Sequence, residues 1–276
     1  MRFMQKAVIV LFVISALIFG FSKVSELFGT SSSAPAIWCE EKEIKVSCNY
    51  TEEEILAGVT AKDKQDGDLT SEIIVGSISR FTEKGRAKVT YVVFDSSNQS
   101  ATYTREVIFE DYVSPRFELA KPLVIKTNTA VNEKELVGAT DIFDGDISSR
   151  TKVIDSNINN SVAGDYVIGV ELTNSFGDLV EAKLPVHVVT EPETRVDITL
   201  KNNVLYLEKG ENFNPLSYVE RVTSFYGKAL DKSVVNVENY VNTEKAGCYE
   251  VKFTATDETG NRGVTYLIVF VTERGQ

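Results

Sequence analysis

Asp63-Lys-Gln-Asp66-Gly67-Asp68 is an acidic turn that recurs later in the chain as Asp141-Ile-Phe-Asp144-Gly145-Asp146. Each copy is followed by an aliphatic residue and then a hydroxyl residue. Alignment on the glycine predicts a third, degenerate copy at Tyr226-Gly227-Lys228. The chain is therefore a repeat array, and stacked repeats typically position a partner rather than transform a substrate.

A second landmark agrees with this alignment, because a glycine precedes a strand of alternating apolar residues in every copy. The three glycines are Gly85, Gly164 and Gly247, and the strands end at Asp95, Asn174 and Asp257. A polar loop and another strand follow each time. Short strands with turn signals about every ten residues predict an all-β protein of three tandem Ig-like antiparallel β-sandwiches behind an N-terminal hydrophobic helix.

Two of the glycine landmarks indicate a tyrosine corner, in which a tyrosine hydroxyl binds upstream backbone. They are Gly164-Asp165-Tyr166 and Gly247-Cys248-Tyr249. Beyond the N-terminus no helical period is convincing. Residues 52–56 and 132–136 could each form one turn of helix.

The repeats and their linkers predict five segments. These are an anchor or signal segment 1–29, a flexible spacer 30–36, and Ig-like domains 37–112 (repeat 1), 113–191 (repeat 2) and 192–276 (repeat 3). The linkers 111–115 and 190–194 are short and contain proline. We therefore expect neighbouring domains to hold a semi-rigid extended line of about 100–120 Å.

The N-terminal segment carries an apolar run over residues 7–21, preceded by Arg2 and Lys6. A run of fifteen residues fits a signal peptide, whereas a longer helix from Met4 to Phe28 would span a bilayer. Both alternatives place the remainder outside the cytoplasm, because the basic residues precede the run. We expect either a single-pass cell-membrane protein with an extracellular C-terminal region or a secreted protein.

Charge and composition exclude several function classes. A net charge of −11 and a pI near 4.8 argue against nucleic acid as a partner. His187 is the one histidine, lies in an alternating strand and has no nucleophile pattern beside it. With no phosphate loop or zinc spacing present, we expect no enzymatic activity and a satisfied structural role for His187.

Residues 61–70, the strand 89–98 and Arg105-Glu-Val107 resemble the bacterial immunoglobulin-like repeat of the pesticidal-crystal-protein type. Residues 139–146 and 164–166 are similar to it in repeat 2, whereas repeat 3 departs at its acidic turn. This family occurs on Gram-positive surface proteins. The resemblance implies an Ig-like sandwich, an extracellular role and no general catalytic activity.

The acidic turns allow two interpretations. Aspartate oxygens could bind calcium, which needs six to eight oxygen ligands. Alternatively, the same side chains accept hydrogen bonds from local backbone amides, as in ordinary Asp-Gly turns. The spacing does not match an EF-hand. Calcium is the one cofactor that remains possible, and its candidate ligands are Asp63, Asp66, Asp68, Asp95, Asp141, Asp144 and Asp146.

Two further groups are candidate sites. Cys39 and Cys48 are close enough in sequence for a disulfide in an exported protein, or they are two reduced thiols. Repeat 3 holds an irregular aromatic set that is either core or a binding surface: Tyr218, Phe225, Tyr226 and Tyr240. We expect the one tryptophan, Trp38, to pack beneath the cysteine segment rather than bind sugar.

The leading hypothesis is a non-enzymatic cell-surface protein that uses a tandem Ig-like stalk to present a distal domain for binding or adhesion. One alternative is a calcium-rigidified adhesin or a module that binds carbohydrate or protein. Another is an accessory subunit of a surface enzyme or transporter. The expected partners are the membrane, through the N-terminal segment, and an unknown extracellular protein or glycan.

Overall fold

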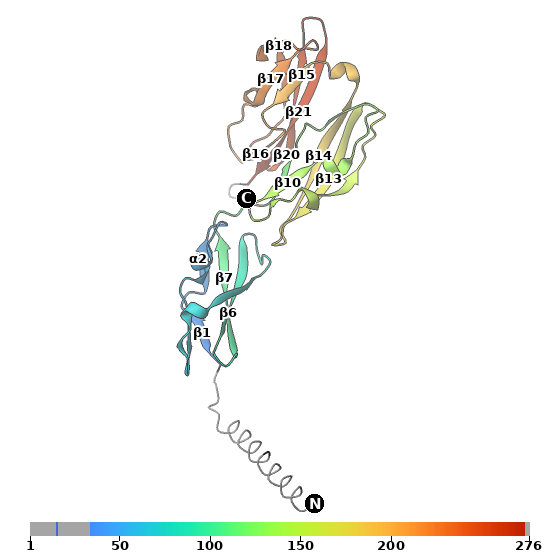
Figure 1. Ribbon diagram of the computed structural model, residues 1–276. Coiled ribbons are helices and arrows are strands. Elements are labelled where there is room, and N and C mark those ends of the chain that lie inside the picture. The colour runs from blue at the N-terminus through green and yellow to red at the C-terminus, as the bar shows by residue number, and fades with distance from the viewer. Residues whose placement is uncertain (1–14, 16–33, 274–276) are drawn as a thin grey trace, which may run out of the picture. The chain divides into compact units, whose positions relative to one another are not determined.

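The structure, a computed structural model, describes Ser15 and residues 34–273 (Figure 1). The described fold is almost entirely β, and each repeat pairs a three-stranded with a four-stranded sheet. This confirms the predicted class of tandem Ig-like β-sandwiches. The predicted N-terminal segment lies outside the described residues except for Ser15. In the described part of the chain, no helix has the length and apolar character needed to cross a bilayer.

Repeat 1 has sheets in the order β1-β3-β4 and β2-β7-β6-β5. Its strands are β1 (Ala36–Cys39), β2 (Glu43–Val46), β3 (Val59–Asp63), β4 (Gly67–Asp68), β5 (Ile74–Ile78), β6 (Arg86–Phe94) and β7 (Ser100–Phe109). Helix α2 (Glu52–Leu56) is the predicted helical turn. Thr51 and Glu54 close its first turn with a reciprocal capping box.

Repeat 2 has sheets in the order β11-β10-β8 and β12-β13-β14-β9. Its strands are β8 (Arg116–Glu118), β9 (Val124–Lys126), β10 (Gly138–Asp141), β11 (Gly145–Asp146), β12 (Lys152–Ser156), β13 (Gly164–Thr173) and β14 (Leu179–Val189). The helical turn predicted at 132–136 is the 3-10 helix η2 (Glu133–Glu135).

Repeat 3 has sheets in the order β15-β17-β18 and β16-β21-β20-β19. Its strands are β15 (Asp197–Leu200), β16 (Val204–Glu208), β17 (Val219–Thr223), β18 (Ala229–Leu230), β19 (Val235–Asn239), β20 (Gly247–Thr256) and β21 (Arg262–Thr272). The sequence predicts antiparallel sheets, but the four-stranded sheets of repeats 2 and 3 each contain one parallel pair of strands. Strand β9 pairs in parallel with β14, and β16 pairs in parallel with β21.

The described chain divides into two compact units. The first holds residues up to Ile44 together with Tyr50–Ile78 and Lys88–Val107, and the second holds Lys45–Asn49, Ser79–Ala87 and the chain from Ile108 onward. The second unit thus contains all of repeats 2 and 3 together with parts of repeat 1. The predicted three-domain boundaries stay a prediction.

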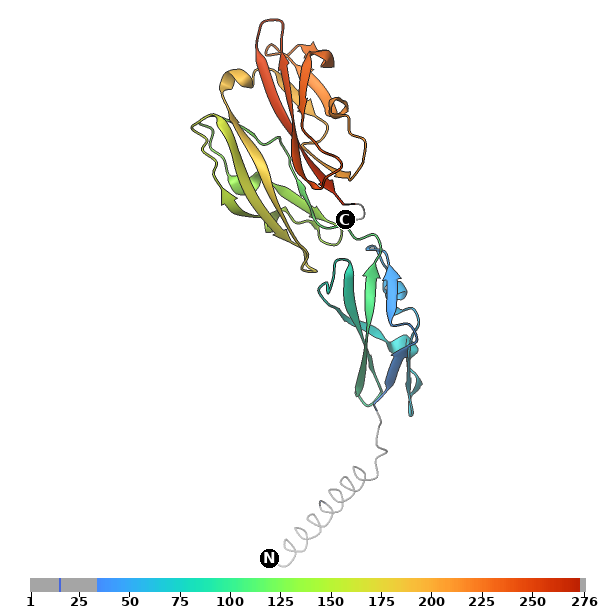
Figure 2. The same ribbon diagram turned by 180° about the vertical axis from the view of Figure 1, so that it is seen from behind.

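Repeats 2 and 3 lie side by side within the second unit, with β14 beside β20 in both views (Figures 1 and 2). Ile268 of β21 is buried in the core of repeat 2, and Phe270 packs against that core. Asn203 donates a side-chain hydrogen bond to the carbonyl of Leu119 at 3.1 Å. The expected extended line is therefore wrong for these two repeats. A shared apolar core holds them laterally instead.

The two repeats run in opposite directions. The start of β21 lies beside the repeat 2–repeat 3 linker, where Thr194 bridges to Gly263. The far end of β21 meets β8, where the rings of Phe270 and Phe117 are 6.4 Å apart between centroids. Strand β8 pairs with β10, which leads into the acidic turn of repeat 2. The turn of repeat 3 is thus at the opposite end of the unit from the turn of repeat 2.

Both predicted tyrosine corners are confirmed. The Tyr166 hydroxyl donates to the carbonyl of Val162 at 2.9 Å, and the Tyr249 hydroxyl donates to the carbonyl of Lys245 at 2.9 Å. Each bond ties the start of a long strand to the preceding loop. The predicted landmarks Gly164 and Gly247 therefore mark equivalent structural positions.

Candidate functional site

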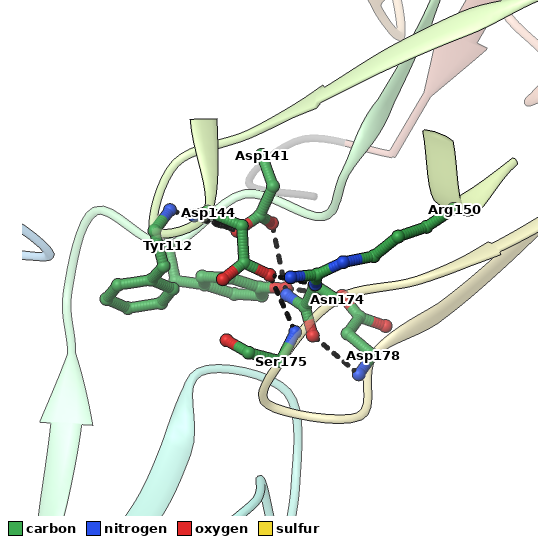
Figure 3. A network of polar contacts seen from close by, with 8 residues as sticks. Tyr112, Asp141, Asp144, Arg150, Asn174, Ser175 and Asp178 are labelled. Atoms are coloured by element: carbon green, nitrogen blue, oxygen red, sulfur yellow. Dashed lines mark hydrogen bonds and ion pairs between the residues drawn. The ribbon is translucent and has the colours of Figure 1, made fainter. Parts of the chain in front are cut away.

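The acidic turn of repeat 2 is used to hold its own loops together (Figure 3). Asp141 Oδ1 accepts hydrogen bonds from the backbone amides of Phe143 and Asp144, at 2.9 and 3.0 Å. Its Oδ2 accepts a bond from the Asn174 side-chain amide at 3.0 Å. Both oxygens of this buried carboxylate therefore have protein donors.

The next two carboxylates of this turn have local partners as well. Asp144 Oδ2 accepts bonds from the Ser175 amide at 2.7 Å and from Arg150 at 2.6 Å (Figure 3). Burial opposes ionisation of Asp144, but these donors outweigh it and lower the pKa of its carboxyl. Asp146 accepts a bond from the Ser148 amide, and hydrogen bonds from Ser148 lower the pKa of Asp146.

Repeat 1 repeats this arrangement with fewer donors. Asp63 Oδ1 accepts the amides of Gln65 and Asp66 at 2.6 and 3.0 Å, and these bonds lower the pKa of Asp63. Asp66 accepts two bonds from Ser96, and Asp68 accepts the Thr70 amide at 3.0 Å. Asp95 is buried and accepts the Gln99 amide at 2.7 Å.

The geometry therefore supports the turn role for these carboxylates. Among residues 34–273, no group of three or more His, Cys, Asp or Glu side chains is arranged to hold a metal ion. One difference separates the two copies. Asp63 Oδ2 is buried without a protein partner, whereas the equivalent oxygen of Asp141 is paired with Asn174. Calcium binding stays a prediction, and repeat 1 is where it would be tested.

We expect Asp141→Ala to destabilise the second unit by about 2 kcal/mol, because it removes three accepted hydrogen bonds from a buried site. Urea unfolding measures this, with millimolar calcium and with chelator. Asp155, exposed on β12, is the matched control, and Asp155→Ala is expected to change little. A loss seen only in calcium would contradict the turn role of Asp141.

The predicted disulfide is not formed, because Cys39, Cys48 and Cys248 are all free thiols in the structure. Burial, with further contributions from Asp111, raises the pKa of the Cys48 thiol to about 12. Cys48 therefore stays protonated near neutral pH and is a poor nucleophile. The Cys39 sulfur instead accepts a bond from Arg105 at 3.2 Å.

Arg105 is a buried cation that the sequence did not single out as a site. Its guanidinium donates to the Tyr91 hydroxyl at 2.7 Å and to the carbonyls of Ile55 and Ala57 at 2.6 and 2.9 Å. These bonds tie α2 to the sheet of β6 and β7. Arg105 is thus an organising residue of the first unit.

The predicted aromatic set of repeat 3 separates into three places. Tyr218 packs with Phe213 against the core. Phe225 and Tyr226 form a contacting pair whose ring centroids are 5.2 Å apart, and they are 50% and 77% exposed. Tyr240 is 77% exposed at the opposite end of β19. Only Phe225 and Tyr226 therefore constitute a candidate surface.

The expected packing of Trp38 is also wrong. Its side chain lies on the exposed side of β1, where it is 41% exposed. A single exposed ring on an edge strand is a weak basis for sugar binding, and Trp38 becomes instead a useful reporter of the first unit.

His187 lies at the interface between repeats 2 and 3, a role that the sequence did not reveal. Its Nδ1 is 2.8 Å from Asp165 Oδ1 and its Nε2 is 2.8 Å from Glu250 Oε2. The ring stacks on Tyr266 of repeat 3 with centroids 3.5 Å apart. The His187 side chain is 5% exposed. Its expected structural role is correct, but the partners come from both repeats.

A carboxylate at each ring nitrogen favours the doubly protonated imidazolium, because a neutral ring has only one N–H to donate. Burial lowers the pKa of His187, but the bonds and charges of Glu250 and Asp165 outweigh burial and raise it above 6.5. Asp165 is 85% exposed and Glu250 is 34% exposed. Glu250 therefore carries more of the attraction, since water screens Asp165.

We expect the second unit to lose stability as pH rises from about 6.5 through the folded pKa of His187. Below that window both the folded and unfolded chains are protonated, so the contribution is fully present. His187→Gln should remove this pH dependence and cost about 2 kcal/mol at pH 6. The imidazole proton resonances measure the folded pKa directly, because the chain has one histidine.

Tyr266→Leu, which keeps both carboxylates, should retain the pH dependence and lose only packing. A folded pKa of His187 at or below 6.5, or an equal pH dependence in His187→Gln, would contradict the imidazolium pairing.

Comparisons with known proteins agree with the coarse architecture. No protein-family model matches the chain. The chain is 30% identical over 225 residues to the pesticidal crystal protein Cry22Aa of Bacillus thuringiensis, and 24% identical over 230 residues to Internalin I of Listeria monocytogenes. These matches cover 76% and 78% of this chain but only 29% and 12% of the relatives. They support a β-rich repeat relationship of the extracellular type, and the specific family stays a prediction.

Two solved structures match the chain with low TM-scores. Drosophila N-cadherin EC1-3 has a TM-score of 0.31 at 10% identity, covering 88% of this chain and 91% of that one. The M60 catalytic domain with the CBM51-1 and CBM51-2 domains of Clostridium perfringens ZmpB has a TM-score of 0.26 at 14% identity, covering 87% of this chain and 31% of that one. Values this low carry no argument about ligand or activity.

Proposed function

We propose that this chain is a non-enzymatic, exported protein, tethered at the surface of a Gram-positive bacterium, that binds an extracellular partner through one end of repeat 3. The predicted segment 1–29 supplies the tether, or an export signal if it is cleaved. Repeat 1 is a spacer. Repeats 2 and 3 act together as the binding head. This differs from the expectation from sequence, in which repeats 1 and 2 form a stalk and repeat 3 alone is the distal domain.

The observation that carries this proposal is the exposed ring pair Phe225 and Tyr226. Folded proteins rarely leave large contiguous apolar groups in water without a use, and aromatic side chains are enriched where partners bind. The Arg195 guanidinium lies over the Phe225 ring at 5.5 Å. It holds one face of the pair in place.

The shared core of repeats 2 and 3 supports this role. A ring pair on a rigid support binds without first ordering its own domain, which reduces the entropy cost of association. The interface around Ile268, Phe117 and Tyr206 supplies that support, since the Phe117 amide donates to the Tyr206 hydroxyl at 2.7 Å.

Beads coated with residues 34–276, which contain the described fold from residue 34 onward, test the proposal. We expect the beads to be retained on intact cells or on immobilised extracellular proteins. Phe225→Ser with Tyr226→Ser should reduce retention at least about tenfold, because truncating a central aromatic anchor typically costs about 2 kcal/mol. Tyr240→Ser, at an equally exposed tyrosine, should leave retention unchanged.

Equal retention of all three proteins would refute binding through this end. Competition by a soluble glycan panel would assign the rings to a sugar ligand.

A further inference from the structure

Internal repetition shows what kind of surface fits the end of repeat 3. Phe143 stands two residues before Gly145 of the repeat 2 turn, and Phe225 stands two residues before Gly227 of the repeat 3 turn. Both glycines adopt positive φ, at 68° and 82°. Strand pairing aligns the two turns one residue further along: Thr140 pairs with Asp146 and Thr223 pairs with Ala229, so Tyr226 occupies the place of Phe143 and Phe225 lies next to it. Repeat 1 has Gln65 at this position. Repeats 2 and 3 therefore share an aromatic residue that repeat 1 lacks.

In repeat 2 this phenylalanine is covered by other rings of the second unit. The ring centroid of Phe143 is 5.0 Å from Phe109, 5.7 Å from Tyr112 and 6.3 Å from Phe81. Phe176, from the loop after β13, lies 4.5 Å away on the same end of repeat 2. Phe81, Phe109 and Tyr112 cover this end of repeat 2, and these three residues are called the aromatic cover below.

Hydrogen bonds to repeat 2 fix the position of the aromatic cover. The Phe81 amide donates to the Phe176 carbonyl at 2.9 Å. The Tyr112 hydroxyl donates to Asp178 at 2.7 Å and accepts from Asn174 at 2.9 Å. The cover is thus a piece of protein surface that combines apolar rings with a backbone donor and one hydroxyl.

The corresponding end of repeat 3 has no such cover among the described residues. Phe225 and Tyr226 are exposed, and the loop at 258–260 beside them is exposed as well. The charges around the rings are already paired with each other. Arg195 lies 3.0 Å from Glu191, and Lys228 lies 3.1 Å from Glu258. The rings are therefore the part of this end with unused binding capacity.

The arrangement of the two rings favours a protein over a glycan. Their planes meet at 74°, so they do not form one flat platform for a sugar ring. An edge-to-face pair instead offers a face and an edge to further aromatic rings, as in the cluster around Phe143.

We infer that the end of repeat 3 docks onto the end of a protein β-sandwich that presents aromatic side chains, in the manner of the aromatic cover on Phe143. The inference rests on the proposed function, since both require the Phe225 end to be free, and it adds the class of partner. The partner contributes rings and backbone donors rather than a charged patch.

The chain contains a suitable probe in its own aromatic cover. Replacing Phe143 and Phe176 by serine weakens the intramolecular contacts of the cover. In residues 34–276 carrying Phe143→Ser and Phe176→Ser, the cover of one copy should then bind the Phe225 end of another. We expect self-association in sedimentation velocity at micromolar concentration, and adding Phe225→Ser should weaken it at least about tenfold. Adding Tyr240→Ser should leave it unchanged.

Association that persists without Phe225, or no association at all, would overturn the inference. A wild-type dimer that depends on Phe225 would also overturn the inference, because the binding partner would then be the same end of repeat 3 in a second copy. If the double variant does not fold, Phe143→Ser alone takes its place with the same expected dependence on Phe225. Bead retention that depends on Phe225 without self-association would leave the proposed function intact and reject only this partner.

Discussion

Gly263→Ala is expected to destabilise the second unit by about 3 kcal/mol, because the added methyl group has no room. A Cβ at Gly263 would lie 2.0 Å from the Val196 carbonyl oxygen and 2.9 Å from the Val196 Cβ. The obstruction is backbone, so no rotamer change relieves it. Here the chain between the linker and β15 passes directly over β21, and the Val196 amide donates to the Arg262 carbonyl at 2.9 Å.

Urea unfolding followed by the ring resonances of His187 measures this loss in the second unit. Gly164→Ala is the matched control, because a Cβ there meets nothing closer than 3.8 Å. We expect that control to change stability by less than about 0.5 kcal/mol. Similar midpoints for the two variants would mean that the chain at Val196 does not need its close approach to β21.

Arg105→Met is expected to destabilise the first unit by about 3 kcal/mol, because it removes three side-chain hydrogen bonds of a buried guanidinium. The Ala57 carbonyl loses its side-chain donor and the Tyr91 hydroxyl loses its guanidinium partner. The Ile55 carbonyl loses one of two donors and keeps the Tyr91 hydroxyl at 2.7 Å. Methionine fills much of the volume, so the loss reports the hydrogen bonds more than a cavity.

Fluorescence of Trp38 reads out this unit selectively, since it is the one tryptophan and lies on β1. Lys62→Met, at an exposed basic residue of β3, is the control and should cost less than about 0.5 kcal/mol. An Arg105→Met midpoint equal to that of the control would show that the buried guanidinium contributes no net stability.

The regular part of the fold follows from local sequence. Alternation of apolar residues after Gly85, Gly164 and Gly247 predicts the long hairpins, and both tyrosine corners are confirmed. These features depend on residues close together in the chain. Period-two patterning and turn chemistry are therefore sufficient to find them.

The lateral packing of repeats 2 and 3 was missed, although a signal exists. Residues 266–271 read Tyr-Leu-Ile-Val-Phe-Val, a continuous apolar run, whereas residues 101–104 of repeat 1 alternate between apolar and polar. A strand that is apolar at successive positions is buried on both faces. Strand β21 indeed packs its own sandwich with Leu267 and Val269 and the neighbouring repeat with Ile268.

The partners of His187 could not be predicted from sequence. Asp165 is its cross-strand neighbour on β13, which the hairpin register would give. Glu250 and Tyr266 belong to the other repeat and reach His187 only because the two repeats pack in opposite directions. Long-range contacts of this kind depend on packing between domains, which local patterns do not encode.

Repeats 2 and 3 form one cooperative unit, a claim that native-state hydrogen exchange can check. In residues 34–276 the slowest amides of the β13–β14 hairpin and of the β20–β21 hairpin should exchange with the same free energy of opening. Gly263→Ala should lower both by the same amount. Loss of protection in β20–β21 alone, with β13–β14 unchanged, would contradict the claim and return repeats 2 and 3 to independent domains.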